Sequence, residues 1–396
     1  MPIRDITSSQ MVISPDADAI NLVNRVINAA IKENASDIHV EPGREKLIIR
    51  IRVDGVLKVA FEAPKEIVQP FVTRIKVLSD LDVTGIPRPQ EGNIKYSVKE
   101  KDVDLRVSVF PTLYGECVVM RILESIHQYK SFEDLGFSME QAKIVDENVS
   151  KPFGLILVTG PTGSGKSTTL FSFLNKLNEP GKSLTTLEDP IERKLEHVRQ
   201  TQVNPDIGLT FASGLRYQLR QDIDIIMVGE IRDAETAKIA IQAAITGQLV
   251  LATIHTNNAA GAVIRLLDMG IEPFLLTSAL KMVTSQRLAR INCPHCRREF
   301  TPAAELLYKI KAPQGAKFYK TEGCDKCSGR GVVGRFGIHE VLPVTESIKN
   351  MVYKNPSDEG INEVAQKEGM VTLRDIALQR AQEGILSIEE VLRITE

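Results

Sequence analysis

The chain has 396 residues, of which 43% are hydrophobic and 25% are charged, and its formal net charge is −2 at pH 7. This composition is typical of a globular protein with about two to four domains, and the near-neutral charge gives no electrostatic reason to expect nucleic acid or an anionic membrane surface as a partner. The sequence shows neither a signal peptide nor an apolar run long enough to span a bilayer, so we expect a cytoplasmic protein.

Residues 1–125 predict a small α+β domain. Apolar residues recur at helical spacing over residues 18–34, with Asp18 as a possible cap. Strands are expected on both sides of Asp54-Gly55, a dipeptide suited to a two-residue hairpin turn. Further strand patterns lie at 103–109 and 117–123.

Two arginines interrupt the later strands of this domain. In VDLRVSV the valines share one face, which leaves Arg106 on the other face, where solvation alone would satisfy it. Arg121 stands among apolar residues in CVVMRIL, and this context predicts a buried guanidinium that needs an anionic partner. A structural carboxylate or a nucleotide phosphate would satisfy it, and spacing alone favours the carboxylate. Cys117 in the same strand is interpreted as a small buried hydrophobe.

From residue 151 the pattern changes, after a polar segment at 126–150 that we expect to be the inter-domain linker. Apolar runs alternate with helical stretches, as in a parallel sheet covered by helices on both faces. Polar chemistry follows four of these runs, at Gly160, Glu188, Glu230 and His255. Because ligands of open parallel sheets bind outside the carboxyl ends of the strands, these residues should converge on one site.

The stretch GPTGSGKS at 160–167 matches the phosphate-binding pattern G-x-x-x-x-G-K-[ST] between a strand and a helix. Its backbone N–H groups would cradle phosphates, Lys166 would reach the β and γ oxygens, and Ser167 would hold Mg²⁺. The residues predicted to bind ATP and Mg²⁺ in this loop are Gly160, Pro161, Thr162, Gly163, Ser164, Gly165, Lys166, Ser167 and Thr168.

Hydrolysis also needs a group that orients the attacking water and an acid that completes the metal shell. Glu230 and Glu188 are the candidates. A glutamate is about one methylene longer than the aspartate that is common at this strand end, so Glu230 would reach past the metal, and we assign it the role of orienting the water. The alternative for either acid is a helix N-cap or a surface ion pair. His255 would sense the γ-phosphate or serve structure alone.

Arg216 and Arg220 in GLRYQLRQD are expected one turn apart on a helix, where they suit a subunit contact or a phosphate contact.

Four of the five cysteines form the pattern C-x₂-C-x₂₇-C-x₂-C. Each C-x₂-C pair can place two thiolates on one side of a tight turn, and the two pairs together would complete a tetrahedral shell for structural zinc. Paired redox thiols are the alternative. The expected ligands are Cys293, Cys296, Cys324 and Cys327. His295 lies inside the first pair and is not expected to be a ligand, with replacement of one cysteine as the alternative. Beyond this element the chain reads as helical, with capping patterns that begin at Thr372 and Ser387.

Several motifs occur in the order typical of the secretion ATPase superfamily. They are SDIHVEP (36–42), RVDGVL (52–57), RPQEG (88–92), DLRVS (104–108), GECVVMRIL (115–123), LEDPIE (187–192), RQDIDIIMVGEIRD (220–233) and LVLATIHTN (249–257). With its four cysteines, the chain resembles the assembly branch of that superfamily, the type II secretion and type IV pilus extension ATPases of the GspE/PilB type. The resemblance extends from about residue 18 to the end of the chain.

The resemblance implies an α/β fold with four parts. These are a PAS-like domain over 1–125, a RecA-like P-loop ATPase domain over 151–290, a tetracysteine zinc element over 291–331 and a helical C-terminal subdomain over 332–396. It also implies roles for single residues. Lys166 matches the phosphate-loop lysine, Glu188 the acidic box, Glu230 the catalytic glutamate, His255 the histidine box, and Arg106 and Arg121 the arginines that reach the γ-phosphate.

The family implies a homo-hexameric motor that hydrolyses Mg-ATP in the cytoplasm and powers pilus or pseudopilus assembly. Its implied cofactors are ATP, Mg²⁺ and Zn²⁺, and its implied partners are an inner-membrane platform protein and a membrane-anchored docking protein. Association with the membrane would then be peripheral, through these partners. Domain closure around ATP and reopening after hydrolysis would supply the stroke.

Departures from the family pattern define the alternatives. Family members usually carry a further N-terminal docking domain, so we expect either a truncated chain or a naturally short member. Ile223 stands where proline is usual, and Cys117 where a basic residue is common. A retraction or competence ATPase is the alternative within the superfamily, although retraction members normally lack the cysteines. A DNA translocase would show a basic face, and a non-catalytic scaffold would have lost Glu188 and Glu230.

Overall fold

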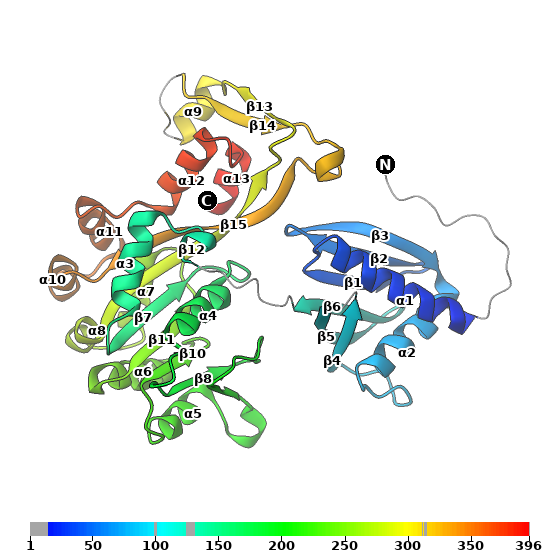
Figure 1. The fold of residues 1–396 in the computed structure, drawn as a ribbon, viewed down its shortest axis with the longest axis horizontal. Helices are drawn as coiled ribbons and strands as arrows, with labels where there is room; N and C mark the ends of the chain where they lie inside the picture. The colour runs from blue at the N-terminus through cyan, green and yellow to red at the C-terminus, as the bar shows by residue number, and fades with distance from the viewer. Residues whose placement is uncertain (1–14, 99–100, 124–130, 311, 313–314, 396) are drawn as a thin grey trace. The chain divides into compact units, whose positions relative to one another are not determined.

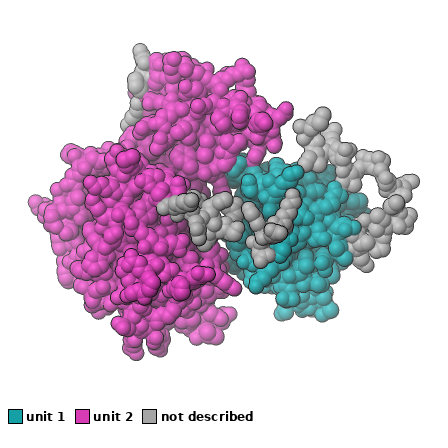
Figure 2. Space-filling view, viewed as in Figure 1, with its two compact units in different colours: residues 1–128 teal, residues 129–396 magenta. Residues whose placement is uncertain are grey.

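The chain folds into two units, residues 1–128 and 129–396 (Figure 2). The structure is a computed structural model, and it describes residues 15–98, 101–123, 131–310, 312 and 315–395 (Figure 1). None of the described helices is long and apolar enough to cross a membrane.

The first unit is a six-stranded antiparallel sheet in the order β3-β2-β1-β6-β5-β4, packed against two helices (Figure 1). The strands are β1 (Asp37–Pro42), β2 (Lys46–Val53), β3 (Val56–Pro64), β4 (Gln90–Val98), β5 (Lys101–Thr112) and β6 (Gly115–Leu123), and the helices are α1 (Pro15–Lys32) and α2 (Val68–Leu78), the latter preceded by a 3₁₀ turn at Lys65–Ile67. Alternate residues of β2 and β6 are buried, as expected where one sheet face meets a core. The helices and this face share one hydrophobic cluster.

The expected hairpin is confirmed, because Asp54 and Gly55 have φ angles of 52° and 82° and join β2 to β3. The helix prediction is confirmed with a different start. α1 begins at Pro15 instead of Asp18, whose side chain lies outside the described part. Val23, Ile27 and Ala30 of the predicted apolar face are fully buried, whereas Ile20 is 41% exposed. The PAS-like assignment of this unit stays a prediction.

The second unit is built on a seven-stranded sheet in the order β15-β12-β7-β11-β10-β8-β9 (Figure 1). Its strands are β7 (Gly154–Thr159), β8 (Leu184–Glu188), β9 (Val198–Gln202), β10 (Ile225–Val228), β11 (Leu249–Ile254), β12 (Leu280–Asn292) and β15 (Val332–Pro343). All neighbours pair in parallel except β12 and β15. β7, β8, β10 and β11 are buried along their whole length, as the continuous apolar runs predicted.

Helices cover both faces of this sheet. The helices α3 (Met139–Val149) and α4 (Lys166–Leu177) contribute to one core cluster. A second cluster takes residues from α5 (Phe211–Gln218), α6 (Ala234–Thr246), α7 (Ala259–Asp268), α8 (Pro273–Ala279), α10 (Glu346–Lys354) and α11 (Asp358–Lys367). The predicted parallel α/β architecture is confirmed.

The predicted linker differs from the structure. Phe132, Leu135 and Phe137 are buried in the core of the second unit, and α3 begins with a full capping box between Ser138 and Gln141. Most of 126–150 therefore belongs to the second unit. Three apolar side chains spaced among polar ones anchor a segment whose average composition looks like a linker.

The rest of the chain forms a small sheet and further helices. These are β13 (Arg297–Phe300), α9 (Ala304–Ile310), β14 (Phe318–Thr321), α12 (Leu373–Gln382) and α13 (Ile388–Thr395), with 3₁₀ turns at Glu133–Leu135, Pro205–Ile207 and Asp325–Cys327 elsewhere in the second unit. Thr372 and Ser387 accept the backbone N–H groups of Asp375 and Glu390, each at 3.2 Å, so both predicted caps form. Residues 332–343 are not helical, because β15 pairs with β12 at the edge of the main sheet.

Candidate functional site

Four neighbouring strands of the second unit end at one edge of its sheet. β7 pairs with β11, β11 with β10, and β10 with β8, all in parallel. Gly160, Glu188, Glu230 and His255 stand at or just after these strand ends. The topology thus brings together the polar positions that the sequence singled out.

The loop between β7 and α4 has the backbone of a phosphate cradle. Gly160, Gly163 and Gly165 have φ angles of 145°, 76° and 90°, which side chains rarely allow. A Cβ on Gly160 would lie 2.5 Å from the carbonyl oxygen of Gln286, so the close approach excludes any other residue. Lys166 Nζ donates to the carbonyl oxygens of Gly160 and Pro161 at 2.9 and 3.0 Å, and burial lowers the pKa of this lysine. The ammonium therefore lies folded over the loop that would hold the phosphates.

Gln286 of β12 holds this loop by hydrogen bonds, and it was not predicted from the sequence. Its amide nitrogen donates to the carbonyl oxygen of Ser164 at 2.8 Å, and its amide oxygen accepts from the Thr169 hydroxyl at 2.9 Å. Gln286 is 1% exposed. The sequence offers no distinctive signal for Gln286, because Thr284, Ser285 and Arg287 beside it in β12 are polar too.

Glu230 forms the centre of a small charged group. Its carboxylate accepts from Arg232, and its second oxygen lies 3.5 Å from His255 Nε2. Burial and the nearby Lys166 lower the pKa of His255, whereas Glu230 acts in the opposite direction. Lys166, Glu230 and His255 therefore share one electrostatic environment. Arg232 was not predicted, although it lies two residues after Glu230.

Glu188 occupies a different position at the end of β8. It is 3% exposed, and its Oε1 accepts from the Thr186 hydroxyl at 2.6 Å and from Gln200 Nε2 at 2.9 Å. Burial raises the pKa of its carboxyl group against both hydrogen bonds. A nearby cation would favour the ionised form of such a group.

Arg106 and Arg121 stand directly opposite each other in the β5–β6 pair of the first unit. Two like charges in this register are unfavourable, and carboxylates offset them: Glu91 lies 2.6 Å from Arg106 and Asp37 lies 3.2 Å from Arg121. The prediction of a buried Arg121 was wrong, since its side chain is 65% exposed. Strand alternation turns Met120 and Ile122 into the core and Arg121 out of it, and Cys117, on the same outward face, is only partly buried.

Arg216 and Arg220 are both exposed. Arg216 pairs with Glu235, and the guanidinium carbon of Arg220 lies 6.0 Å from the centre of the Tyr217 ring. The two arginines do not share a helix, because α5 ends at Gln218.

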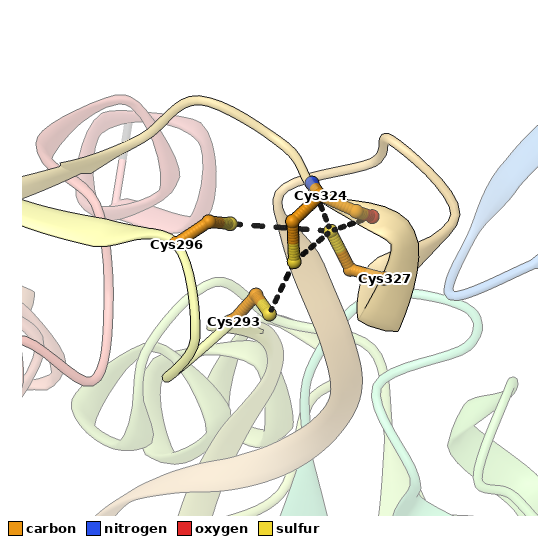
Figure 3. A group of neighbouring side chains, drawn as sticks. All are labelled: Cys293, Cys296, Cys324 and Cys327. Carbon is orange, nitrogen blue, oxygen red and sulfur yellow. Dashed lines mark hydrogen bonds between the residues drawn. The ribbon is translucent and has the colours of Figure 1, made fainter.

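The four predicted zinc ligands form one cluster (Figure 3). Their sulfur atoms lie within 4.8 Å of one another, with 3.9 Å between Cys293 and Cys324, 4.0 Å between Cys296 and Cys327, and 3.8 Å between Cys324 and Cys327. Zinc–sulfur bonds of about 2.3 Å in a tetrahedron separate the sulfurs by roughly 3.8 Å. The donor set therefore fits zinc, and the exposed His295 lies outside it.

Comparisons with known proteins identify the family of the chain. Residues 14–393 match the model of a family described as "Type II/IV secretion system protein". The chain is 46% identical over 384 residues to the type IV pilus assembly ATPase PilB of Thermus thermophilus, covering 96% of this chain and 43% of that protein. It is 44% identical over 391 residues to the type II secretion system protein E of Pseudomonas aeruginosa, covering 98% of this chain and 78% of that protein.

Solved structures show the same fold. The pilus retraction motor PilT with bound ADP superposes with a TM-score of 0.62 at 27% identity, covering 93% of this chain and 96% of that one. The Legionella pneumophila ATPase DotB gives a TM-score of 0.71 at 20% identity over 100% and 99% of the two chains, which bears on the fold alone. The chain therefore belongs to the type II/IV secretion system protein family and is an ATPase of the GspE/PilB type.

Proposed function

We propose that this chain is the cytoplasmic motor subunit of a type II secretion or type IV pilus machine, and that it assembles as a hexamer. The observation that carries the proposal is the meeting of Lys166, Glu230 and His255 at the ends of parallel strands. A hexamer would turn an inner-membrane platform protein and would reach the membrane through a docking partner, without spanning the bilayer itself.

In this proposal the residues of the second unit divide the work at ATP. The loop 160–168 binds the phosphates, Lys166 neutralises their charge, and Ser167 holds Mg²⁺. Glu230 orients the attacking water, and its contact with His255 supports a shared position beside the γ-phosphate. The place of Glu188 at the buried end of β8 supports a role near the metal, where Mg²⁺ would stabilise its carboxylate. Zinc would hold the tetracysteine element together without entering the reaction.

Four arginines are proposed to contact a phosphate or a neighbouring subunit. Arg106 and Arg121 would bind the γ-phosphate as a pair, and their unfavourable cross-strand register supports a need for two adjacent positive charges. Arg216 and Arg220 suit a subunit contact or a phosphate contact, and their exposure is compatible with both.

Changing Arg121 to glutamine tests the arginine pair. Because Arg106 would retain part of the charge, we expect kcat to fall about tenfold, with unchanged thermal stability. Arg50→Gln is the matched control, since Arg50 also pairs with a carboxylate on the sheet of this unit, that of Glu41. Equal kcat values in the two variants and the unmodified chain would remove Arg121 from the mechanism and would contradict the proposed pair.

Assembly is tested by the rate of Mg-ATP hydrolysis per chain as a function of protein concentration. We expect the rate per chain to climb as hexamers form, in parallel with the hexamer fraction from analytical ultracentrifugation. A rate that is constant while the oligomer changes would contradict assembly-dependent activity. Stimulation by DNA instead of by assembly would favour the translocase alternative.

A further inference from the structure

A buried carboxylate in β15 serves the starts of two helices. Glu340 is 3% exposed, and its Oε1 accepts from the backbone N–H of Ala259 at 2.8 Å while its Oε2 accepts from that of Leu373 at 3.3 Å. Ala259 and Leu373 are the first residues of α7 and α12. The first amides of a helix lack backbone acceptors and favour negative charge, so one carboxylate satisfies two helix starts.

The helix α7 follows directly on residues 255–258, which we call the His255 loop. One side of this loop is held by the strand that leads into the phosphate loop. The Thr159 hydroxyl accepts from the Thr256 N–H at 2.9 Å and donates to the carbonyl oxygen of Ile254 at 2.7 Å. Thr159 is fully buried, so this link lies inside the unit.

The other side of the His255 loop is held by β12 and the C-terminal helices. Arg287 donates to the carbonyl oxygen of Asn257 at 2.8 Å. The side chain of Asn258 donates to Asp358 of α11 at 2.9 Å and also caps α7 by accepting from the Gly261 N–H at 2.7 Å. Glu340 adds the link to α12, and the position of the loop therefore depends on residues about 100 positions further along the chain.

Placing an ionisable group at this point is costly. Burial raises the pKa of Glu340, and a carboxylate out of water is stable only when its oxygens find donors. Here the donors are the two helix starts. Of the nearby charges, that of Asp358 is unfavourable and that of Arg287 is favourable. An apolar residue would fill the same space without linking α7 to α12.

We propose that Glu340 is a positioning residue for ATP hydrolysis: it fixes α7 and the His255 loop so that His255 stays against Glu230, and it couples this loop to α12. The inference rests on the proposed function, in which Glu230 and His255 act beside the γ-phosphate. It makes α11 and α12 part of the structure that sets the rate.

The test compares Glu340→Gln with Glu390→Gln in the full chain. The amide keeps the shape of Glu340 but turns one acceptor into a donor that faces a backbone N–H. Glu390 is the matched control, because it is equally buried at 3% and accepts from Arg290 and Arg393 without a bond to α7. We expect Glu340→Gln to lower kcat about tenfold while KM for ATP changes less than about threefold, since a small displacement near the reacting groups is costly. Glu390→Gln should lower thermal stability and keep kcat.

A second readout follows the imidazole of His255 directly. The chain has six histidines, so NMR spectra of protein with histidine labelled at Cε1 should show six imidazole signals. The signal that is lost in His255→Ala belongs to residue 255. We expect Glu340→Gln to shift this signal and Glu390→Gln to leave it in place. In the His255→Ala background, Glu340→Gln should change kcat by less than about twofold, because coupled residues do not act additively.

An unshifted His255 signal in Glu340→Gln would overturn the proposal, as would equal losses of kcat in the two glutamine variants. A wild-type kcat in His255→Ala has a different meaning. It would contradict the proposed role of His255 in hydrolysis, and the position of the His255 signal would then decide alone whether Glu340 positions the loop.

Discussion

Glu230→Gln is expected to lower kcat for ATP hydrolysis by about 10²–10³-fold, the range typical of a lost general base or water-orienting group. The amide has the size of the carboxylate but cannot take a proton or hold a water by two acceptors. Lys166 and the glycine loop are unchanged, so KM for ATP should change less than about threefold. Steady-state kinetics of the purified variant with Mg-ATP measure both constants.

The control for this variant is Arg232→Gln. It removes the ion pair of Glu230 and keeps the carboxylate. Because Arg232 is 60% exposed, its ion pair contributes little, and we expect kcat to change only a few-fold. If Glu230→Gln retained normal turnover and Glu188→Gln lost it, the water-orienting role would belong to Glu188.

Cys293→Ser is expected to lower the free energy of unfolding by several kcal/mol and to abolish zinc binding. Cys293 is fully buried, and its sulfur lies 3.9 Å from that of Cys324. A structural zinc site contributes its binding energy to folding, and a hydroxyl is a poor replacement for a thiolate. Metal analysis should find about one zinc per unmodified chain. Calorimetry without nucleotide should show a lower midpoint for the variant and for the chelated protein.

Cys117→Ser serves as the matched control, because Cys117 is a partly buried cysteine of the first unit and does not belong to the four-sulfur cluster. It should leave the zinc content and the midpoint unchanged. Zinc-free protein of full stability, with a disulfide detected by mass spectrometry, would support the redox alternative instead.

Local patterns predicted much of the second unit. The strand-loop-helix pattern of residues 154–177 and the two cysteine pairs are each defined by residues close together in the chain. Their short spacing limits the structures that these residues can form. The parallel pairing of these strands followed from their alternation with helices, and parallel neighbours place their carboxyl ends at one edge. The linker prediction was wrong because the polar average composition of this segment hides three core residues, Phe132, Leu135 and Phe137.

By itself, the sequence determined the positions of the phosphate loop, the cysteine pairs and the acids after the apolar runs, because each pattern depends on neighbours close along the chain. Only the tertiary structure decided which partners these groups meet. Arg121 pairs with a carboxylate 84 residues away, and Ser164 is held by a glutamine 122 residues away. Such contacts depend on strand register and crossovers, which leave no periodic signal in the sequence. The same holds for Glu340, whose role is visible only where two helix starts meet one buried carboxylate.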